Sequence, residues 1–281
     1  MKRQHVQKIG EILSLVAAAI VIIPIFLVII LILVNGIQAL SWEFISQPPR
    51  SGMTEGGIWP AILGTILLTI VTAIVVMPFG IGAAIYLAEY AGDNRFTRAI
   101  HLAIVNLAGI PSIVYGLFGL GAFVLFFNLG TSIIAGALTL GLMTLPIIIS
   151  TSEEAILSVP QEFRIVSRSL GATHWQTVRH VVLPNATPGI ITGVILGLVR
   201  AAGETAPILF TVAAFYLPEL PRSLLDQTMA LPYHLYVIST QVPGMPLQIQ
   251  YGTALVLLLM VLSFTVVAAI IRAIMRRRRE W

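Results

Sequence analysis

The chain has 281 residues, of which 57% are hydrophobic and only 10% are charged, a composition that excludes an ordinary soluble domain and is typical of a polytopic membrane protein. It contains no cysteine, which excludes disulfides, thiolate catalysis and cysteine-ligated metal sites, and its five scattered histidines predict no metal centre. The formal charge of +4 does not indicate nucleic-acid binding, because the basic residues cluster beside apolar stretches, as topology signals do.

Six apolar stretches are long enough for a membrane helix, which needs about 20 residues. The first begins soon after Met-Lys-Arg, but it is too long for the core of a signal peptide, so we expect an uncleaved membrane helix. None alternates polar and apolar residues as a barrel strand does. The sequence therefore predicts an all-α membrane protein with six transmembrane helices, at residues 12–34, 58–88, 99–127, 131–150, 188–215 and 252–271.

The second and third stretches are longer than a bilayer requires, so we expect them to tilt or to project from it. The third contains Gly109-Ile110-Pro111-Ser112, where the proline lacks an N–H and the glycine is flexible. This tetrapeptide is the strongest kink candidate in the chain.

The basic residues lie mainly on one side of the predicted membrane helices, and such a bias marks the cytoplasmic side. Only Arg50 and Arg222 fall on the opposite side. Both termini are therefore expected in the cytoplasm, which agrees with an even number of spans. Residues 152–187 are then cytoplasmic, and residues 216–251 are external. The external segment contains an apolar stretch at 229–238 that is too short to span a membrane, so it predicts a re-entrant or surface helix. The thirteen basic residues on the cytoplasmic side are Lys2, Arg3, Lys8, Arg95, Arg98, Arg164, Arg168, Arg179, Arg272 and residues 276–279.

The cytoplasmic segment predicts two short helices that meet at a bend. Pro160 suits a first helical turn, and Gly171 suits the positive φ of a helix C-terminus. Thr173 and Gln176 form a capping box that starts a second helix, which Pro184 and Pro188 are expected to end. Each helix carries an apolar face, and these faces suit either docking on another protein or an amphipathic connector on the membrane surface. The two faces consist of Phe163, Val166 and Leu170, and of Trp175, Val178 and Val182.

Arg200 and Glu204 are the only Lys, Arg, Asp or Glu residues inside the predicted spans. Their i, i+4 spacing places them on one helix face and permits an ion pair, and Gly203 beside them suggests close helix approach. A charge at bilayer depth is costly and usually functional, which favours a solute path over a structural ion pair. The sequence therefore predicts Arg200 and Glu204 as solute-path residues.

The segment 165–184 resembles the cytoplasmic signature of ABC-importer permeases. In this chain nine residues separate Gly171 from Val181-x-Leu183-Pro184, which is the spacing of that signature. Ile165-Val166-Ser167 stands where that signature has Glu-Ala-Ala. The resemblance implies the type I permease fold, with a core at residues 58–281 preceded by a helix and an external loop at residues 1–57. It also implies that residues 152–187 couple to an ATPase subunit, through Leu170, Gly171, Ala172, Thr173, Trp175, Leu183 and Pro184.

Residues 108–123, 199–215 and 229–240 are similar to the phosphate-specific group of these permeases. The similarity implies import of inorganic phosphate across a prokaryotic plasma (inner) membrane. It implies four kinds of partner besides membrane lipid: a second, related permease, two ATP-binding subunits, an external phosphate-binding protein and phosphate itself. Because the only lysines are Lys2 and Lys8, the chain has no P-loop, so we expect no ATPase activity. A Ser/His/Asp or paired-carboxylate enzyme is equally unsupported, so we expect no other enzymatic activity. We also expect no cofactor.

Three alternatives remain at this stage. The signature alone also permits a permease for another oxyanion, such as sulfate or molybdate. A self-sufficient channel or secondary transporter often contains internal repeats, which this sequence lacks. An intramembrane enzyme requires a second polar constellation within the spans, and none is present.

Overall fold

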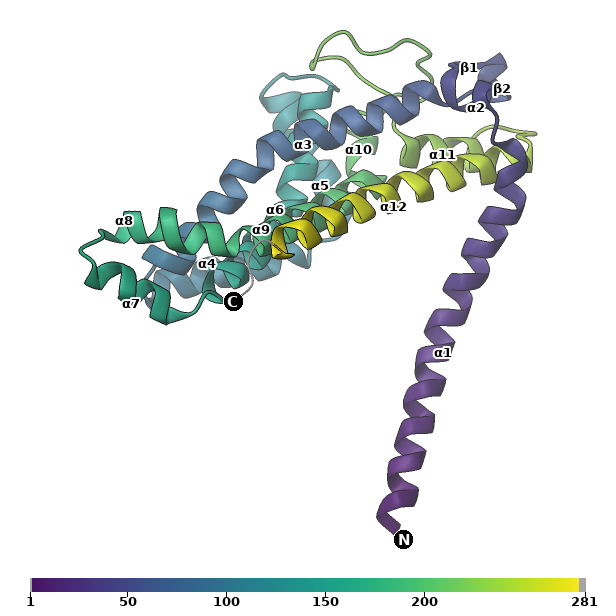
Figure 1. The fold of residues 1–281 in the computed structure, drawn as a ribbon. Helices are drawn as coiled ribbons and strands as arrows, with labels where there is room; N and C mark the ends of the chain where they lie inside the picture. Colours follow the sequence, from purple (N-terminus) through teal and green to yellow (C-terminus); the bar gives the residue numbers. More distant parts are fainter. Residues whose placement is uncertain (1, 278–281) are drawn as a thin grey trace.

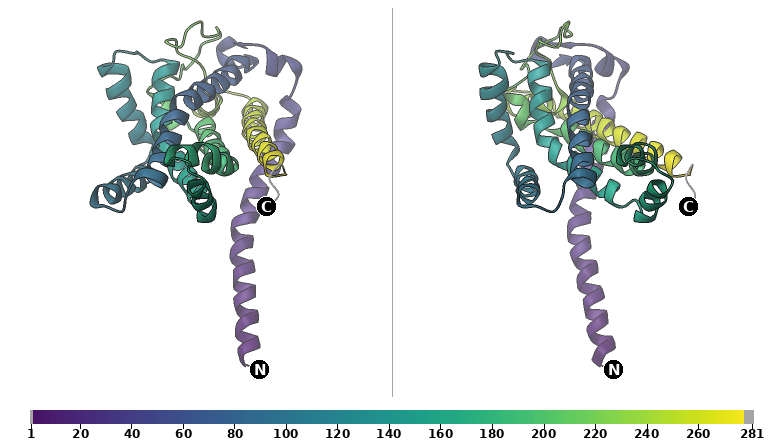
Figure 2. Two further views of the ribbon diagram at one scale, coloured as in Figure 1. Left: turned by 60° about the vertical axis from the view of Figure 1, so that its left-hand side comes forward. Right: turned by 90° about the vertical axis from the view of Figure 1, so that its left-hand side faces the viewer.

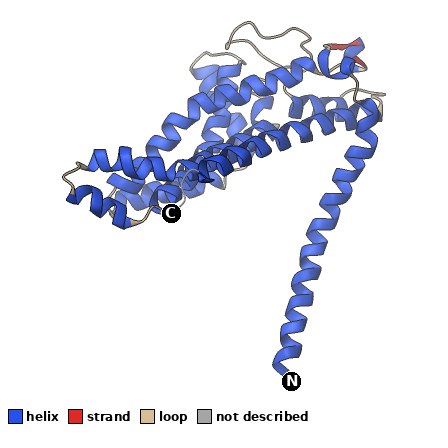
Figure 3. Cartoon of the chain, viewed as in Figure 1, coloured by secondary structure: helices blue, strands red, loops and turns tan. Residues whose placement is uncertain are grey.

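The computed structural model describes residues 2–277, which are largely helical (Figures 1 and 3). The π-helical turns Tyr86–Tyr90 and Leu120–Phe126 extend α3 and α5, and a third, Val178–Val182, joins α8 to α9. A two-residue hairpin pairs β1 (Pro49–Arg50) with β2 (Glu55–Gly56). The α-helices are α1 (Lys2–Gly36), α2 (Trp42–Ser46), α3 (Trp59–Ile85), α4 (Arg95–Ala108), α5 (Ser112–Gly119), α6 (Ile133–Leu157), α7 (Gln161–Ser169), α8 (His174–Thr177), α9 (Leu183–Gly203), α10 (Ala206–Leu209), α11 (Leu231–Thr240) and α12 (Leu247–Arg277).

Within residues 2–277, five helical stretches are long and apolar enough to cross a membrane, or six if the bent pair α4–α5 counts as one span. They contain α1, α3, α6, α9 and α12. The all-α membrane fold predicted from composition is therefore confirmed, although the third and fifth predicted spans need correction.

Helix α6 forms the centre of the bundle, between α3 and α9. Ile148 of α6 packs against a glycine on each neighbouring helix, Gly80 of α3 and Gly197 of α9. A Cβ added at Gly80 would lie 2.7 Å from Ile148 Cγ2, and a Cβ added at Gly197 would lie 3.0 Å from Ile148 Cγ1. Small residues let helix backbones approach closely in a membrane protein. Thr72 and Thr139 are fully buried, and each hydroxyl donates to the carbonyl four residues earlier, which satisfies it within its own helix.

Helix α1 projects away from the other helices over most of its length (Figures 1 and 2). Its C-terminal end packs against α12, where a Cβ on Gly36 would lie 2.6 Å from the carbonyl oxygen of Tyr251. The apolar side chains of α1 are exposed, as expected for a helix surrounded by lipid or by another protein chain.

The third predicted span is a bent pair of helices. Helices α4 and α5 meet at 101° across residues 109–111, which confirms the predicted kink but contradicts a single long, tilted span. Pro111 is extended and precedes α5, because it cannot donate to the preceding turn. The Tyr115 hydroxyl donates to the Leu107 carbonyl oxygen at 2.7 Å, so a side chain bridges the two helices across the break.

The fifth predicted span is wrong at both ends. A continuous helical stretch runs from His174 to Gly203, so Pro184 and Pro188 do not end a helix as expected. The π-helical turn Val178–Val182 precedes Pro184, and this wider turn accommodates a residue that lacks an N–H. The stretch ends at Gly203 rather than at residue 215, because Glu204 is extended and a new short helix, α10, begins at Ala206.

The apolar stretch at residues 229–238 covers most of α11 and the two residues before it. Leu231, Val237 and Ile238 are fully buried, and the Leu231 N–H donates to Thr65 Oγ1 of α3 at 2.8 Å. Helix α11 packs between α3 and α12, at the end of the bundle opposite α7 and α8 (Figure 1). This burial contradicts the surface helix and favours the re-entrant alternative.

Candidate functional site

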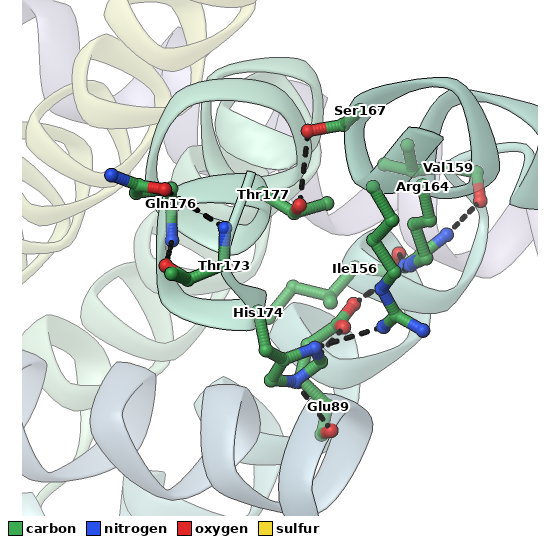
Figure 4. Close-up of polar contacts among 10 residues, drawn as sticks. Glu89, Ile156, Val159, Arg164, Ser167, Thr173, His174, Gln176 and Thr177 are labelled. Atoms are coloured by element: carbon green, nitrogen blue, oxygen red, sulfur yellow. Dashed lines mark hydrogen bonds and ion pairs between the residues drawn. The ribbon is translucent and has the colours of Figure 1, made fainter. Parts of the chain in front are cut away.

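The first candidate site is the α7–α8 segment, which we define as residues 158–182. It has the predicted helix–bend–helix form, with Gly171 at φ +85° in the bend. The Thr173 hydroxyl accepts a hydrogen bond from the Gln176 N–H, and Gln176 Oε1 accepts one from the Thr173 N–H, which confirms the capping box (Figure 4). Gly171 is needed at this φ because other residues rarely adopt it.

The exposed apolar side chains of this region form a surface patch at one end of the molecule. Leu170 is 84% exposed, and Trp175 is 52% exposed. The prediction that the second apolar face is exposed is wrong in part. Trp175 is exposed, but Val178 and Val182 of the same face are fully buried. The exposed apolar side chains of α7, α8 and the bend between them are Ile165, Val166, Leu170 and Trp175, and we call them the α7–α8 patch.

The residues predicted for ATPase coupling fall into three positions. Leu170 and Trp175 lie on the α7–α8 patch, while Gly171, Ala172 and Thr173 form the bend. Leu183 and Pro184 are half-buried in the long helix that continues into α9, and Leu183 packs against the core. Sequence reasoning therefore grouped residues that shape the segment with residues whose side chains are exposed.

Sequence reasoning missed the principal polar contact of this segment. The Arg164 guanidinium donates to Glu89 Oε1 through Nε at 3.0 Å and through a terminal nitrogen at 2.6 Å. It also donates to the carbonyl oxygens of Ile156 and Val159, at the end of α6. Both charged side chains are buried, with 8% of Arg164 and 3% of Glu89 exposed. A pair separated by 75 residues has no spacing signal, and Arg164 was counted only as a topology charge.

His174, at the start of α8, contacts the same region of α3. Its Nε2 lies 3.0 Å from the Glu89 carbonyl oxygen, and its Nδ1 lies 2.8 Å from a terminal nitrogen of Arg168. A carbonyl oxygen accepts and a guanidinium donates, so these contacts fit the neutral tautomer that carries its proton on Nε2. Glu89 therefore contacts both helices of the segment (Figure 4).

The second candidate site is the predicted solute-path pair. Arg200 Nε donates to Glu204 Oε1 at 3.3 Å, so the two side chains pair as expected. They do not share a helix face, however, because α9 ends at Gly203 and Glu204 is extended. A Cβ added at Gly203 would meet no atom within 4 Å in the described part of the chain. The prediction that another helix approaches closely at this glycine is therefore wrong within the single chain. The Arg200 side chain is 42% exposed and that of Glu204 19% exposed, which places the pair at the surface of the single chain.

Helix α5 lies beside this pair. A Cβ on Gly116 would lie 2.8 Å from the Ala206 carbonyl oxygen, so α5 and α10 are in close contact. The fold therefore brings together two sequence stretches, 108–123 and 199–215, that the sequence analysis identified separately.

Comparison with known proteins identifies relatives over most of the chain. Residues 77–281 match the family described as "Binding-protein-dependent transport system inner membrane component". A probable ABC transporter permease protein of Bacillus subtilis, YqgI, is 35% identical over 251 residues, covering 84% of this chain and 85% of the relative. The phosphate transport system permease protein PstA 1 of Mycobacterium tuberculosis is 35% identical, covering 80% and 72%. A probable PstA of Methanocaldococcus jannaschii is 33% identical, covering 87% and 86%.

Solved structures show the same fold at low sequence identity. A permease chain of the inward-facing MetNI methionine ABC transporter aligns with a TM-score of 0.64 at 18% identity, covering 78% of this chain and 97% of that chain. A chain of a bacterial ABC transporter that imports alginate aligns with a TM-score of 0.68 at 13% identity, covering 99% of both chains. The chain therefore belongs to the family of binding-protein-dependent transport system inner membrane components and has the type I fold of ABC-importer permeases.

Proposed function

We propose that this chain is a permease subunit of an ATP-driven importer of inorganic phosphate. It forms the solute path with a second, related permease, receives phosphate from an external binding protein and is driven by two separate ATPase subunits. The relatives named PstA support the solute. The observation that carries the proposal is the exposed Arg200 guanidinium near the end of an otherwise uncharged helix, where it pairs with Glu204 just beyond the helix end.

The chemistry of the pair suits a protonated phosphate. A guanidinium stays charged in a membrane and offers a planar fork of N–H groups that matches phosphate oxygens. The contact with Glu204 engages Nε, and the terminal nitrogens are the donors that a phosphate would meet. Glu204 offsets part of the positive charge, so that phosphate is released again, and its carboxylate accepts a hydrogen bond from the phosphate proton, which fully ionised sulfate lacks.

The position of the pair favours a path between two permeases. A charged guanidinium that faces lipid is costly, so the exposed face of Arg200 is better covered by a second permease. We infer that the two permeases meet at this face and that phosphate passes between them.

The α7–α8 patch provides the ATPase contact in this proposal. The chain has no P-loop, so hydrolysis is the work of the partner subunits, whereas this chain acts as a permease without enzymatic activity. Exposed apolar patches with polar surroundings mark protein–protein contacts. We propose docking rather than a connector that lies in the membrane surface; the buried Glu89–Arg164 pair anchors the segment to the bundle.

Gly171→Val is expected to uncouple or release the ATPase while the membrane helices still fold. A Cβ added at Gly171 would meet no atom within 4 Å, so the expected effect comes from forcing φ +85° on a β-branched residue, which costs about 1–3 kcal/mol. The measurement is co-purification of the ATPase and its hydrolysis rate with phosphate-loaded binding protein. Gly92→Val is the matched control, because its Cβ also meets nothing and its φ is not positive. Normal co-purification and stimulated hydrolysis in Gly171→Val would remove this residue from the coupling mechanism.

We also propose that the protein lies in a prokaryotic plasma membrane with both termini in the cytoplasm. The bias of lysine and arginine supports this orientation. Reporters that are active only outside the membrane, fused after Arg50, Glu219 and the C-terminal residue, are expected to be active at the first two positions only. Activity at the third would contradict the proposed topology.

A further inference from the structure

Three parts of the chain meet at the buried Arg164 side chain. It comes from α7, it donates to two main-chain carbonyl oxygens at the end of α6, and it pairs with Glu89 in the π-helical turn that ends α3 (Figure 4). All of these contacts except the one to Val159 connect residues at least eight positions apart. The guanidinium therefore fixes α7 to two helices of the membrane bundle at once.

The same turn of α3 also receives α8. The Glu89 carbonyl oxygen accepts from His174 Nε2, and the Tyr90 ring meets the His174 ring edge-on, with centroids 4.8 Å apart. Arg168 donates to the other nitrogen of His174 and so links α7 to α8. Both helices that carry the α7–α8 patch are thus attached to one residue, Glu89.

Helix α3 extends from this contact to the other end of the molecule (Figure 1). It continues from Trp59 through the π-helical turn to Tyr90, and it packs against α6 and against α9, the helix that carries Arg200. Near its other end, Thr65 accepts the hydrogen bond that positions α11. One continuous helical stretch therefore connects Glu89 with the part of α3 that packs against the helix carrying Arg200.

A neighbouring ion pair lacks these properties and provides a comparison. Arg98 and Asp93 contact each other at 3.0 Å, but their side chains are 70% and 77% exposed and only five residues apart. Exposed pairs contribute little to a fold. The Glu89–Arg164 pair is buried, has several hydrogen bonds and spans 75 residues, so the two pairs differ in what they can transmit.

We propose that Glu89 and Arg164 are positioning residues that transmit movement of the α7–α8 segment to α3, and through α3 to the solute path. This inference rests on the proposed coupling to an ATPase. Neither side chain contacts the solute; their role is to keep α3 attached to the segment while the segment moves with its partner. The π-helical turn suits this position, because such turns are frequent at functional sites and adjust more readily than a regular helix.

The test uses the complete importer, reconstituted with its ATPase subunits, second permease and binding protein. The main variant is the double change Glu89→Leu with Arg164→Met, because it removes the pair without leaving one charge buried. Arg98→Gln, which breaks the exposed pair nearby, is the matched control. The measured quantities are ATPase co-purification, basal hydrolysis, hydrolysis stimulated by phosphate-loaded binding protein, and phosphate transported per ATP.

We expect the double variant to assemble and to hydrolyse ATP at the basal rate, while stimulation and transport per ATP fall about tenfold, within the range of coupling between distant sites. Arg164→Lys keeps the charge but loses the fork, so its stimulation should be intermediate. Stimulation and uptake equal to those of Arg98→Gln would overturn the proposal. Loss of assembly confined to the double variant would assign the pair to folding and would also overturn it. A wild-type complex that takes up no phosphate would instead refute the proposed function, so the two failures are distinguishable.

Discussion

Arg200→Gln is expected to reduce ATP-dependent phosphate uptake to background while the permease still assembles with its partners. The guanidinium is partly exposed in the single chain and supplies the only arginine or lysine charge of the predicted spans. Losing a hydrogen bond to a charged ligand costs about 1.5–3 kcal/mol, which alone lowers transit at least about tenfold. The measurement is uptake of labelled phosphate into proteoliposomes that contain the complete importer, with sulfate as the competing oxyanion.

The double change Arg200→Gln with Glu204→Gln separates transport from stability. Arg200→Gln on its own leaves Glu204, whose side chain is 19% exposed, without its partner. If the pair were structural, this unpaired charge would lower the amount of folded complex. The double variant strands no charge, so we expect normal assembly without uptake. Recovery of both assembly and uptake in the double variant would make Arg200 and Glu204 a structural ion pair. Arg200→Lys keeps a charge without the planar fork, so partial uptake at most is expected.

Local patterns in the sequence predicted local structure well. The break at residues 109–112 follows from one glycine and one proline, and the bend at Gly171 followed by the Thr173 capping box follows from residues that stand next to each other. The pairing of Arg200 with Glu204 follows from their spacing, although the helix ends between them. In each case the residues that determine the structure lie within a few positions along the chain.

Features that depend on packing could not be predicted in the same way. The 101° angle between α4 and α5 is set by the helices around them, and the helix through Pro184 depends on a π-helical turn for which no sequence rule was available. The Glu89–Arg164 pair joins residues that only the tertiary fold brings together. The apolar character of Val178 was recognised, but whether it faces a partner or the core depends on where α8 lies.

Gly64→Ala is expected to destabilise the fold strongly, because α3 touches the chain before α11 at this glycine. An added Cβ would overlap the Met229 carbonyl oxygen and Thr228 Oγ1. These atoms cannot easily move, since the Thr228 N–H donates to the Val212 carbonyl oxygen and the Leu231 N–H donates to Thr65. Overpacking usually costs about 1–3 kcal/mol, and we expect the upper end of this range because the obstacle includes backbone.

Gly82→Ala is the matched control for this prediction, because it lies in the same helix and its added Cβ would meet no atom within 4 Å. Alanine is also more favourable than glycine in a helix by about 1 kcal/mol, so the Gly82→Ala variant should unfold at or above the wild-type midpoint temperature. The measurement is the thermal unfolding of the detergent-solubilised protein, followed by the fraction that elutes as a single species after heating. A clearly lower midpoint for Gly64→Ala, with Gly82→Ala unchanged or higher, is the expected result. Equal midpoints for the two variants would mean that α3 does not pack against Met229 at Gly64, and the buried position of α11 would then have to be revised.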